Sequence, residues 1–223
     1  VSITLAILFL SVYFTYQWTQ SILHPARFSP TGNSLKENNI EYQDIELITK
    51  DGIKLSAWYT PPKNGAVILI AHGYNDNRPE SLHVLFAKHD YGVLSWDFRS
   101  HGDSAGEIST LGYYERLDVE AALDFALTQE GVEHIGAWGG SMGASTVLLT
   151  ASERSEIKAV VADSAFPSLE DVLKLNMPIE FLHPLVKFFS ETQSGAKIED
   201  VNVEQVIGQI SPRAVFIIDG WYG

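Results

Sequence analysis

The chain has 223 residues, of which 45% are hydrophobic and 19% are charged. This length and composition fit one compact domain with a substantial core and exclude a disordered chain. The net charge of −13 argues against nucleic acid or another anionic surface as the main partner. Because cysteine is absent, disulfides and thiolate metal sites are excluded as well.

Residues 1–20 are mostly apolar, and the first charged residue is Arg27. A run of about 17–25 mostly apolar residues is long enough to cross a bilayer. Tyr13, Tyr16 and Trp18 at its far end are typical of an interfacial aromatic belt. We therefore predict a transmembrane or signal-anchor helix over 1–20, which would make the protein a single-pass, membrane-anchored one with its orientation undetermined. The alternatives are a cleaved signal peptide, although no small-residue cleavage site follows, or a buried helix.

Residues 21–40 are rich in proline, asparagine and serine and are expected to form a connector. Two alternating runs follow, joined by Asp51-Gly52, and they predict a β-hairpin. Further along, the hydrophobic pattern alternates between strand and helix. Strands are expected at 66–73, 91–98, 134–139, 157–164 and 214–220, and helices at 79–90, 112–130 and 142–153.

This alternation predicts an α/β fold, with a mainly parallel sheet and helices on both faces. The domain is expected to cover 41–223. Residues 165–212 interrupt the rhythm, because they contain three prolines and a cluster of large apolar residues but no clear strand. We expect a small helical insertion there that covers one end of the sheet as a lid. A plain surface excursion is the alternative.

The stretch Gly139-Gly140-Ser141-Met142-Gly143 fits the pattern G-x-S-x-G. A predicted strand ends directly before it and a predicted helix begins directly after it. A sharp strand–turn–helix elbow exposes a nucleophilic serine above the edge of the sheet. Ser141 is therefore the candidate nucleophile, and the Met142 backbone N–H at the helix N-terminus is a candidate donor to an oxyanion.

A second oxyanion donor is expected from the loop after an earlier central strand. The stretch "AHGYNDNR" follows the strand at 66–71. The Tyr74 backbone N–H is the natural candidate in that loop. An ordinary turn with an incidental histidine, His72, is the alternative.

These blocks resemble the α/β-hydrolase superfamily, and more closely its N-terminally anchored, single-domain members related to monoacylglycerol lipases and serine aminopeptidases. The resemblance covers about residues 24–220. It rests on "HP-R", "DGIKLSAWY-PP", "AHGYNDNR", "YGVLSWDFRSHGDSAG", "LGYYERLDVEAALDF", "GAWGGSMGAS", "AVVADSAF" and "IEDVNVEQVIGQISPRAVFIIDG". It implies a serine hydrolase that cleaves an ester-like, small-molecule substrate, with acyl or lipid substrates as one option. It also implies structural roles for Asp97, Arg99 and His101.

The acid and the base of a catalytic triad are not evident in the sequence. In this fold the acid follows the serine and the histidine comes last. Asp163 and Asp219 are weak candidates for the acid, and His183 is the one internal histidine considered as a base. Three explanations are open. The triad is completed beyond Gly223, which would leave this chain inactive; it is rearranged internally; or the protein is a degenerate hydrolase that serves as a membrane-attached binding module.

No metal site and no cofactor are predicted. His24, His83, His89 and His134 lack metal-ligand spacing and are expected to be solvated or packed surface residues. The glycines around Ser141 do not fit a dinucleotide fingerprint.

Overall fold

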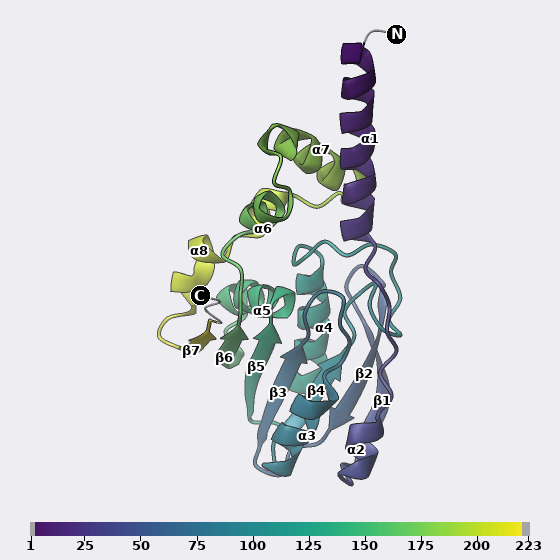
Figure 1. Cartoon of the computed structure of the whole chain (residues 1–223). Coiled ribbons are helices and arrows are strands. Elements are labelled where there is room, and N and C mark those ends of the chain that lie inside the picture. Colours follow the sequence, from purple (N-terminus) through teal and green to yellow (C-terminus); the bar gives the residue numbers. More distant parts are fainter. Residues whose placement is uncertain (1–2, 220–223) are drawn as a thin grey trace.

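A seven-stranded β-sheet forms the centre of the protein in a computed structural model that describes residues 3–219 (Figure 1). Its strand order is β1-β2-β4-β3-β5-β6-β7. The strands are β1 (Gln43–Ile48), β2 (Lys54–Thr60), β3 (Ala66–Ala71), β4 (Gly92–Trp96), β5 (His134–Gly140), β6 (Ile157–Asp163) and β7 (Ala214–Ile218). The first two strands are antiparallel to their neighbours, and β4, β3, β5, β6 and β7 pair in parallel. The sequence-based prediction of a mainly parallel sheet is confirmed.

The predicted hairpin joins β1 and β2, with Ile48 opposite Lys54. Its turn is longer than two residues. The Thr49 N–H donates to the Ile53 carbonyl, and Gly52 has φ +85°, a conformation that favours glycine.

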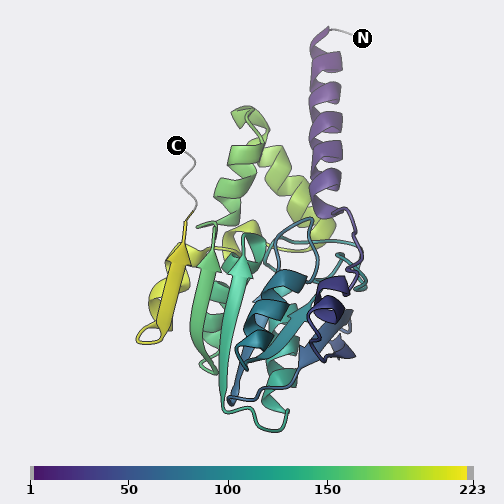
Figure 2. The same ribbon diagram turned by 60° about the horizontal axis from the view of Figure 1, so that its bottom comes forward.

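Helices cover both faces of the sheet, as the alternation of the sequence predicts. Figures 1 and 2 show α3 on one face and α4 and α5 on the other. The helices before β7 are α1 (Ile3–Leu23), α2 (Asn33–Glu37), α3 (Glu80–Lys88), α4 (Glu115–Leu127), α5 (Met142–Glu153), α6 (Leu169–Asn176), α7 (His183–Ser194) and α8 (Val203–Val206). Every residue of α5 from Met142 to Ala151 is buried, because this helix lies against the sheet and also against α4 and α8.

The helical insertion, residues 165–212, contains α6, α7 and α8 together with short 3-10 turns and no named strand. It leaves the body of the domain through a narrow neck, where Ser168 forms an isolated β-bridge with Asn202. The Leu169 N–H donates to the Val201 carbonyl, and the Val203 N–H donates to the Pro167 carbonyl. We call residues 169–200, beyond this neck, the arm. The arm rises above the sheet beside α1 (Figure 1).

Helix α1 has 21 residues and is formed over most of the segment predicted to cross a membrane. Among the described residues, however, no helix combines the length and the apolarity needed to cross a membrane. The prediction of a transmembrane helix over 1–20 therefore does not hold for residues 3–20, and Val1 and Ser2 lie outside the described residues. The physical reason is that the second half of α1 is polar, with Thr15, Gln17 and Gln20.

That polar second half of α1 packs against α7 of the arm. The ring of Tyr16 lies edge-on to that of Phe189, with 5.6 Å between the centroids. Gln20 donates a hydrogen bond to Gln193. In contrast, the first half exposes apolar side chains, namely those of Ile3, Leu5, Ile7, Leu8, Phe9 and Leu10.

Candidate active site

Ser141 lies at a sharp turn between β5 and α5, as the G-x-S-x-G pattern predicts. Its backbone has φ +48° and ψ −114°, a strained conformation for a residue with a side chain. Two hydrogen bonds hold the turn: the Ser141 N–H donates to the Asp163 carbonyl over 2.8 Å, and the Ser145 N–H donates to the Ser141 carbonyl over 3.1 Å. Ser141 is exposed, whereas the residues that follow it are buried.

Two glycines of the motif are required by close backbone contacts. A Cβ atom on Gly139 would lie 2.5 Å from the carbonyl oxygen of Gly143 and 2.6 Å from Ala144 backbone atoms. A Cβ atom on Gly143 would lie 2.2 Å from the carbonyl oxygen of Ala71 and 2.5 Å from that of His72. Gly143, in the first turn of α5, therefore packs directly on the end of β3. The motif brings the nucleophile next to the loop after β3 because no side chain separates them.

The loop after β3 is held by His72, which is fully buried. The Phe98 N–H donates to His72 Nε2 over 2.9 Å, so Nδ1 carries the proton and donates to the Gly73 carbonyl over 2.7 Å. Burial, with a smaller contribution from nearby His101, lowers the pKa of His72 to about 3. Both ring nitrogens are thus engaged, and the ring is neutral. His72 positions the loop and is not available as a base for Ser141.

The two expected oxyanion donors are the backbone N–H groups of Met142, directly after the serine, and of Tyr74, in the loop after β3. A Cβ atom on Gly73 would lie 3.6 Å from the Ser141 Cβ, so the loop passes directly beside the nucleophile. Neither the Met142 nor the Tyr74 backbone N–H donates a hydrogen bond within residues 3–219. Unpaired N–H groups beside a nucleophile are what stabilisation of an oxyanion requires.

Ser141 opens into a shallow pocket of about 250 Å³ at the carboxyl edge of the parallel strands. Asp163, at the end of β6, lines this pocket and accepts a hydrogen bond from the Ser164 hydroxyl over 2.9 Å. The other lining residues are His72, Gly73, Asp76, Pro79, Trp138, Gly140 and Ser164.

The structure separates the other triad candidates from Ser141. His183 is part of the arm, where its Nε2 lies 2.8 Å from the Met177 carbonyl oxygen, and it does not line the Ser141 pocket. Asp219 is exposed after the end of β7 and does not line that pocket either. A triad of Ser141, Asp163 and His183 is therefore not assembled, because the neck places the arm apart from the elbow. Gly223, beyond which one explanation places the rest of the triad, lies outside the described residues.

The block "DFRSHGDSAG" is held together by buried ion pairs. Asp97 accepts hydrogen bonds from the Arg78 and Asp103 backbone N–H groups, and the Arg78 guanidinium lies 3.1 Å from its carboxylate. Arg99 pairs with the buried Asp118 at 2.6 Å and with Asp51 at 2.8 Å. These contacts fix the loop after β4 beneath His72.

Tyr74 also connects the site to α1. Its hydroxyl donates to the Ile22 carbonyl over 2.7 Å, and burial raises the pKa of this phenol to about 12. Beside it, the Ser109 N–H donates to the Leu23 carbonyl. The buried carboxylate of Glu115 accepts hydrogen bonds from the Thr110 and Gly112 N–H groups and so holds this neighbouring loop. The end of α1 is thereby fixed to the residue that carries an oxyanion donor.

Sequence reasoning missed several contributors to the site. Trp138 and Ser164 line the pocket; both lie in blocks that carry the family resemblance, but neither was predicted as a site residue. Their positions near the carboxyl ends of β5 and β6 were a usable signal, since ligands of open parallel sheets bind at that edge. His83 was expected at the surface but is buried, with Nδ1 2.8 Å from the Ser95 hydroxyl and Nε2 2.9 Å from the Thr60 hydroxyl.

A mostly parallel sheet covered on both faces, with a serine at a strained strand–helix turn, defines the α/β-hydrolase class of fold. The chain belongs to this family: the model of the alpha/beta hydrolase fold matches residues 66–200. Among solved structures it is similar to the Pyrococcus furiosus esterase Pf2001, with a TM-score of 0.69 and 27% sequence identity over 89% of this chain and 90% of that one.

Curated relatives are similar over most of this chain but extend further. The Bacillus subtilis protein YqkD is 29% identical in an alignment of 180 residues that covers 74% of this chain and 58% of YqkD. Protein bem46 of Schizosaccharomyces pombe is 26% identical in an alignment of 190 residues that covers 78% of this chain and 62% of bem46. The aligned part of this chain thus spans about three fifths of the length of these relatives.

Proposed function

We propose that the protein is a serine hydrolase that cleaves carboxylic ester-like small molecules through an acyl-enzyme on Ser141. The observation that carries this proposal is the exposed, strained Ser141 next to the Met142 and Tyr74 N–H groups, which are unpaired within residues 3–219. The similarity to the Pyrococcus furiosus esterase supports the ester as the substrate class.

In this mechanism the Ser141 oxygen attacks the ester carbonyl while a base takes its proton. The Met142 and Tyr74 N–H groups stabilise the negative charge on the carbonyl oxygen, where one such donor contributes about 3–4 kcal/mol. The tetrahedral intermediate collapses, and the leaving alcohol takes the proton back. Water then attacks the acyl-enzyme with the same base, which releases the carboxylic acid and regenerates Ser141.

The base is, in this proposal, a histidine that a longer form of the chain would supply after the acid, since the histidine comes last in the chain order of this fold. Within residues 3–219 the one histidine that lines the Ser141 pocket is His72, and its two nitrogens are engaged. Asp163 is close enough to share the pocket and remains a candidate for the acid. Because no histidine within residues 3–219 lines this pocket with a free ring nitrogen, a second candidate function is a binding module that keeps the elbow but does not turn over a substrate.

A fluorophosphonate probe separates these functions. We expect the 223-residue chain to be labelled weakly, because an unassisted serine hydroxyl is a poor nucleophile. Any longer natural form of the chain should be labelled strongly, and Ser141→Ala should abolish the labelling. Ser155→Ala, at an exposed serine, is the matched control and should leave it unchanged. Labelling that survives Ser141→Ala, or a longer form that is never labelled, would contradict the hydrolase proposal. Strong labelling of the 223-residue chain would contradict a base outside residues 3–219.

Attachment to a membrane stays a prediction from the sequence. The apolar residues that the first half of α1 exposes are compatible with it.

A further inference from the structure

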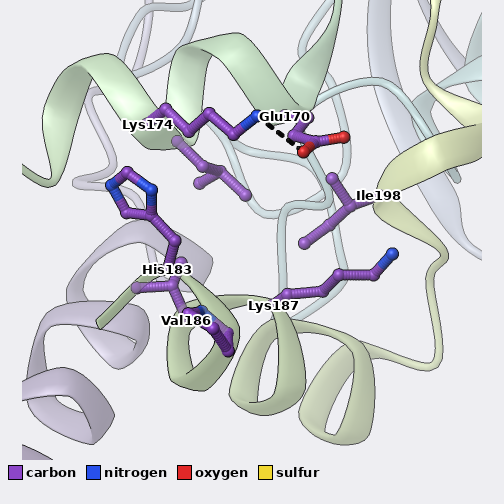
Figure 3. A pocket seen from close by; sticks show the side chains of 8 residues that line it. Glu170, Lys174, His183, Val186, Lys187 and Ile198 are labelled. Atoms are coloured by element: carbon purple, nitrogen blue, oxygen red, sulfur yellow. Dashed lines mark ion pairs between the residues drawn. The ribbon is translucent and has the colours of Figure 1, made fainter. Parts of the chain in front are cut away.

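A second cavity lies inside the arm, between α6 and α7, and it shares no lining residue with the pocket around Ser141. Its volume is about 290 Å³, close to the lower end of small-molecule sites at about 300–1,000 Å³. Figure 3 shows side chains from both helices and from Ile198 meeting around it. The cavity therefore belongs to the arm alone and is separate from the proposed hydrolytic site.

The inner wall of the cavity is apolar. Leu173 comes from α6, Val186 from α7 and Ile198 from the turn that follows α7. These side chains are only 7%, 2% and 4% exposed, so they belong to the core of the arm and are held in place by it. A preformed apolar wall of this kind accommodates an alkyl chain, and each methylene buried there raises the affinity about fourfold.

The rim of the cavity carries two ammonium groups from opposite helices. The Nζ of Lys174 on α6 lies 2.7 Å from a Glu170 carboxylate oxygen (Figure 3). The Nζ of Lys187 on α7 lies 2.9 Å from a carboxylate oxygen of Glu199 and 3.8 Å from one of Glu191. Glu191 is about a third exposed, and each of the other four side chains is about half exposed. Both lysines thus already hold a carboxylate in place, yet exposed pairs of this kind contribute little stability, so another carboxylate can exchange into them.

An apolar wall beneath two lysines selects a ligand with an alkyl chain and an anionic end. We propose that the arm binds a medium-chain fatty acid, with the chain against Leu173, Val186 and Ile198 and the carboxylate at Lys174 and Lys187. This site is independent of the proposed hydrolase function, because binding there requires neither Ser141 nor a catalytic base.

The first test is a titration of the 223-residue chain with a series of ligands, followed by calorimetry. Decanoate should bind saturably and about 15-fold more tightly than octanoate, because two further methylene groups are buried. Decanol should bind at least fivefold more weakly than decanoate, because it lacks the carboxylate. Absence of saturable decanoate binding, equal affinities for octanoate and decanoate, or equal affinities for decanol and decanoate would overturn the proposal.

The second test places the ligand in the cavity. Val186→Trp fills the cavity and should reduce decanoate affinity more than tenfold. Lys187→Gln should reduce it about fivefold and leave decanol binding unchanged. Lys36→Gln, on exposed α2 far from the arm, is the matched control and should have no effect. If circular dichroism shows that Val186→Trp does not fold, the surface variant Lys187→Gln decides. Decanoate affinity equal to wild type in Lys187→Gln, or in folded Val186→Trp, would overturn the proposal.

Discussion

The elbow around Ser141 and the arm above it are packed in opposite ways. At the elbow, backbone meets backbone so closely that a single methyl group on Gly143 has no space. In the arm, two helices enclose a cavity of about 290 Å³, and Leu175 of α6 and Phe181 of the turn before α7 are exposed to solvent. The comparison indicates that the sheet side fixes atomic positions, whereas the arm has room for a ligand. Substitutions should therefore lower the free energy of unfolding strongly at the elbow and only slightly in the arm.

The largest difference is expected between two glycine substitutions. Gly143→Ala should lower the free energy of unfolding by about 3 kcal/mol or more, because the new Cβ atom would meet two backbone carbonyl oxygens at 2.2 and 2.5 Å. Gly208→Ala, in the helical insertion, should change it by less than about 0.5 kcal/mol, since nothing lies within 4 Å of that Cβ position. Urea denaturation measures both. Because Gly208 lies outside both the elbow and the arm, similar effects of the two substitutions would contradict the close packing at the elbow.

An effect of intermediate size is expected in the pH dependence of the free energy of unfolding, through the buried His83 on the sheet side. Burial lowers the pKa of His83 to about 3, whereas an unfolded histidine titrates near 6.5. Between these values the unfolded state binds a proton that the folded state does not, so stability falls as the pH falls below about 6.5. At pH 5 the cost from this residue is about 2 kcal/mol.

The ring signals of His83 in an NMR titration check this expectation directly. They should not shift between pH 7 and pH 5 while the protein stays folded. In parallel, His83→Gln should make the free energy of unfolding less dependent on pH over that range by about 2 kcal/mol. A titration midpoint near 6.5 in the folded protein would show that the His83 site is more open than its burial indicates.

The smallest effect is expected where the loop beside Ser141 is joined to α1. Tyr74→Phe removes the hydrogen bond from the hydroxyl to the Ile22 carbonyl and should cost about 1 kcal/mol. Amide hydrogen exchange should speed up in the last turn of α1 and remain unchanged in α5. Tyr113→Phe, which removes the hydroxyl of a half-buried tyrosine that makes no hydrogen bond within residues 3–219, is the matched control. Faster exchange in α5 as well would indicate that the end of α1 and the elbow are not mechanically separate.

The sequence predicts the sheet side well because its signals are local. The continuous apolar runs that became β3 and β4, and the pattern around Ser141, depend on neighbouring residues only. The start of α4 was placed too early: residues 112–114 are not helical, because Gly112 has φ +121° and its N–H donates to the Glu115 carboxylate. Such a contact between a side chain and a loop leaves no periodic signal.

Long-range contacts explain what the sequence could not predict. The burial of His83 depends on hydroxyl groups from two different strands, those of Thr60 and Ser95. The separation of His183 from Ser141 depends on the neck, which is formed by residues more than thirty positions apart in the chain. The apolar start of α1 suggested a membrane span, but the polar turns that follow contact α7 of the arm.

The neck between Ser168 and Asn202 has a consequence for how this fold can vary. Its two strands of chain are bridged to each other, so the arm enters and leaves the domain at one point. Seen from the sheet, the whole arm is equivalent to one long loop with fixed ends. An exchange of residues 169–200 for a segment of different length or composition would therefore leave the turn that carries Ser141 intact. Because of the neck, the arm can be replaced as a unit, and its ligand preference can change while the conformation of the elbow stays the same.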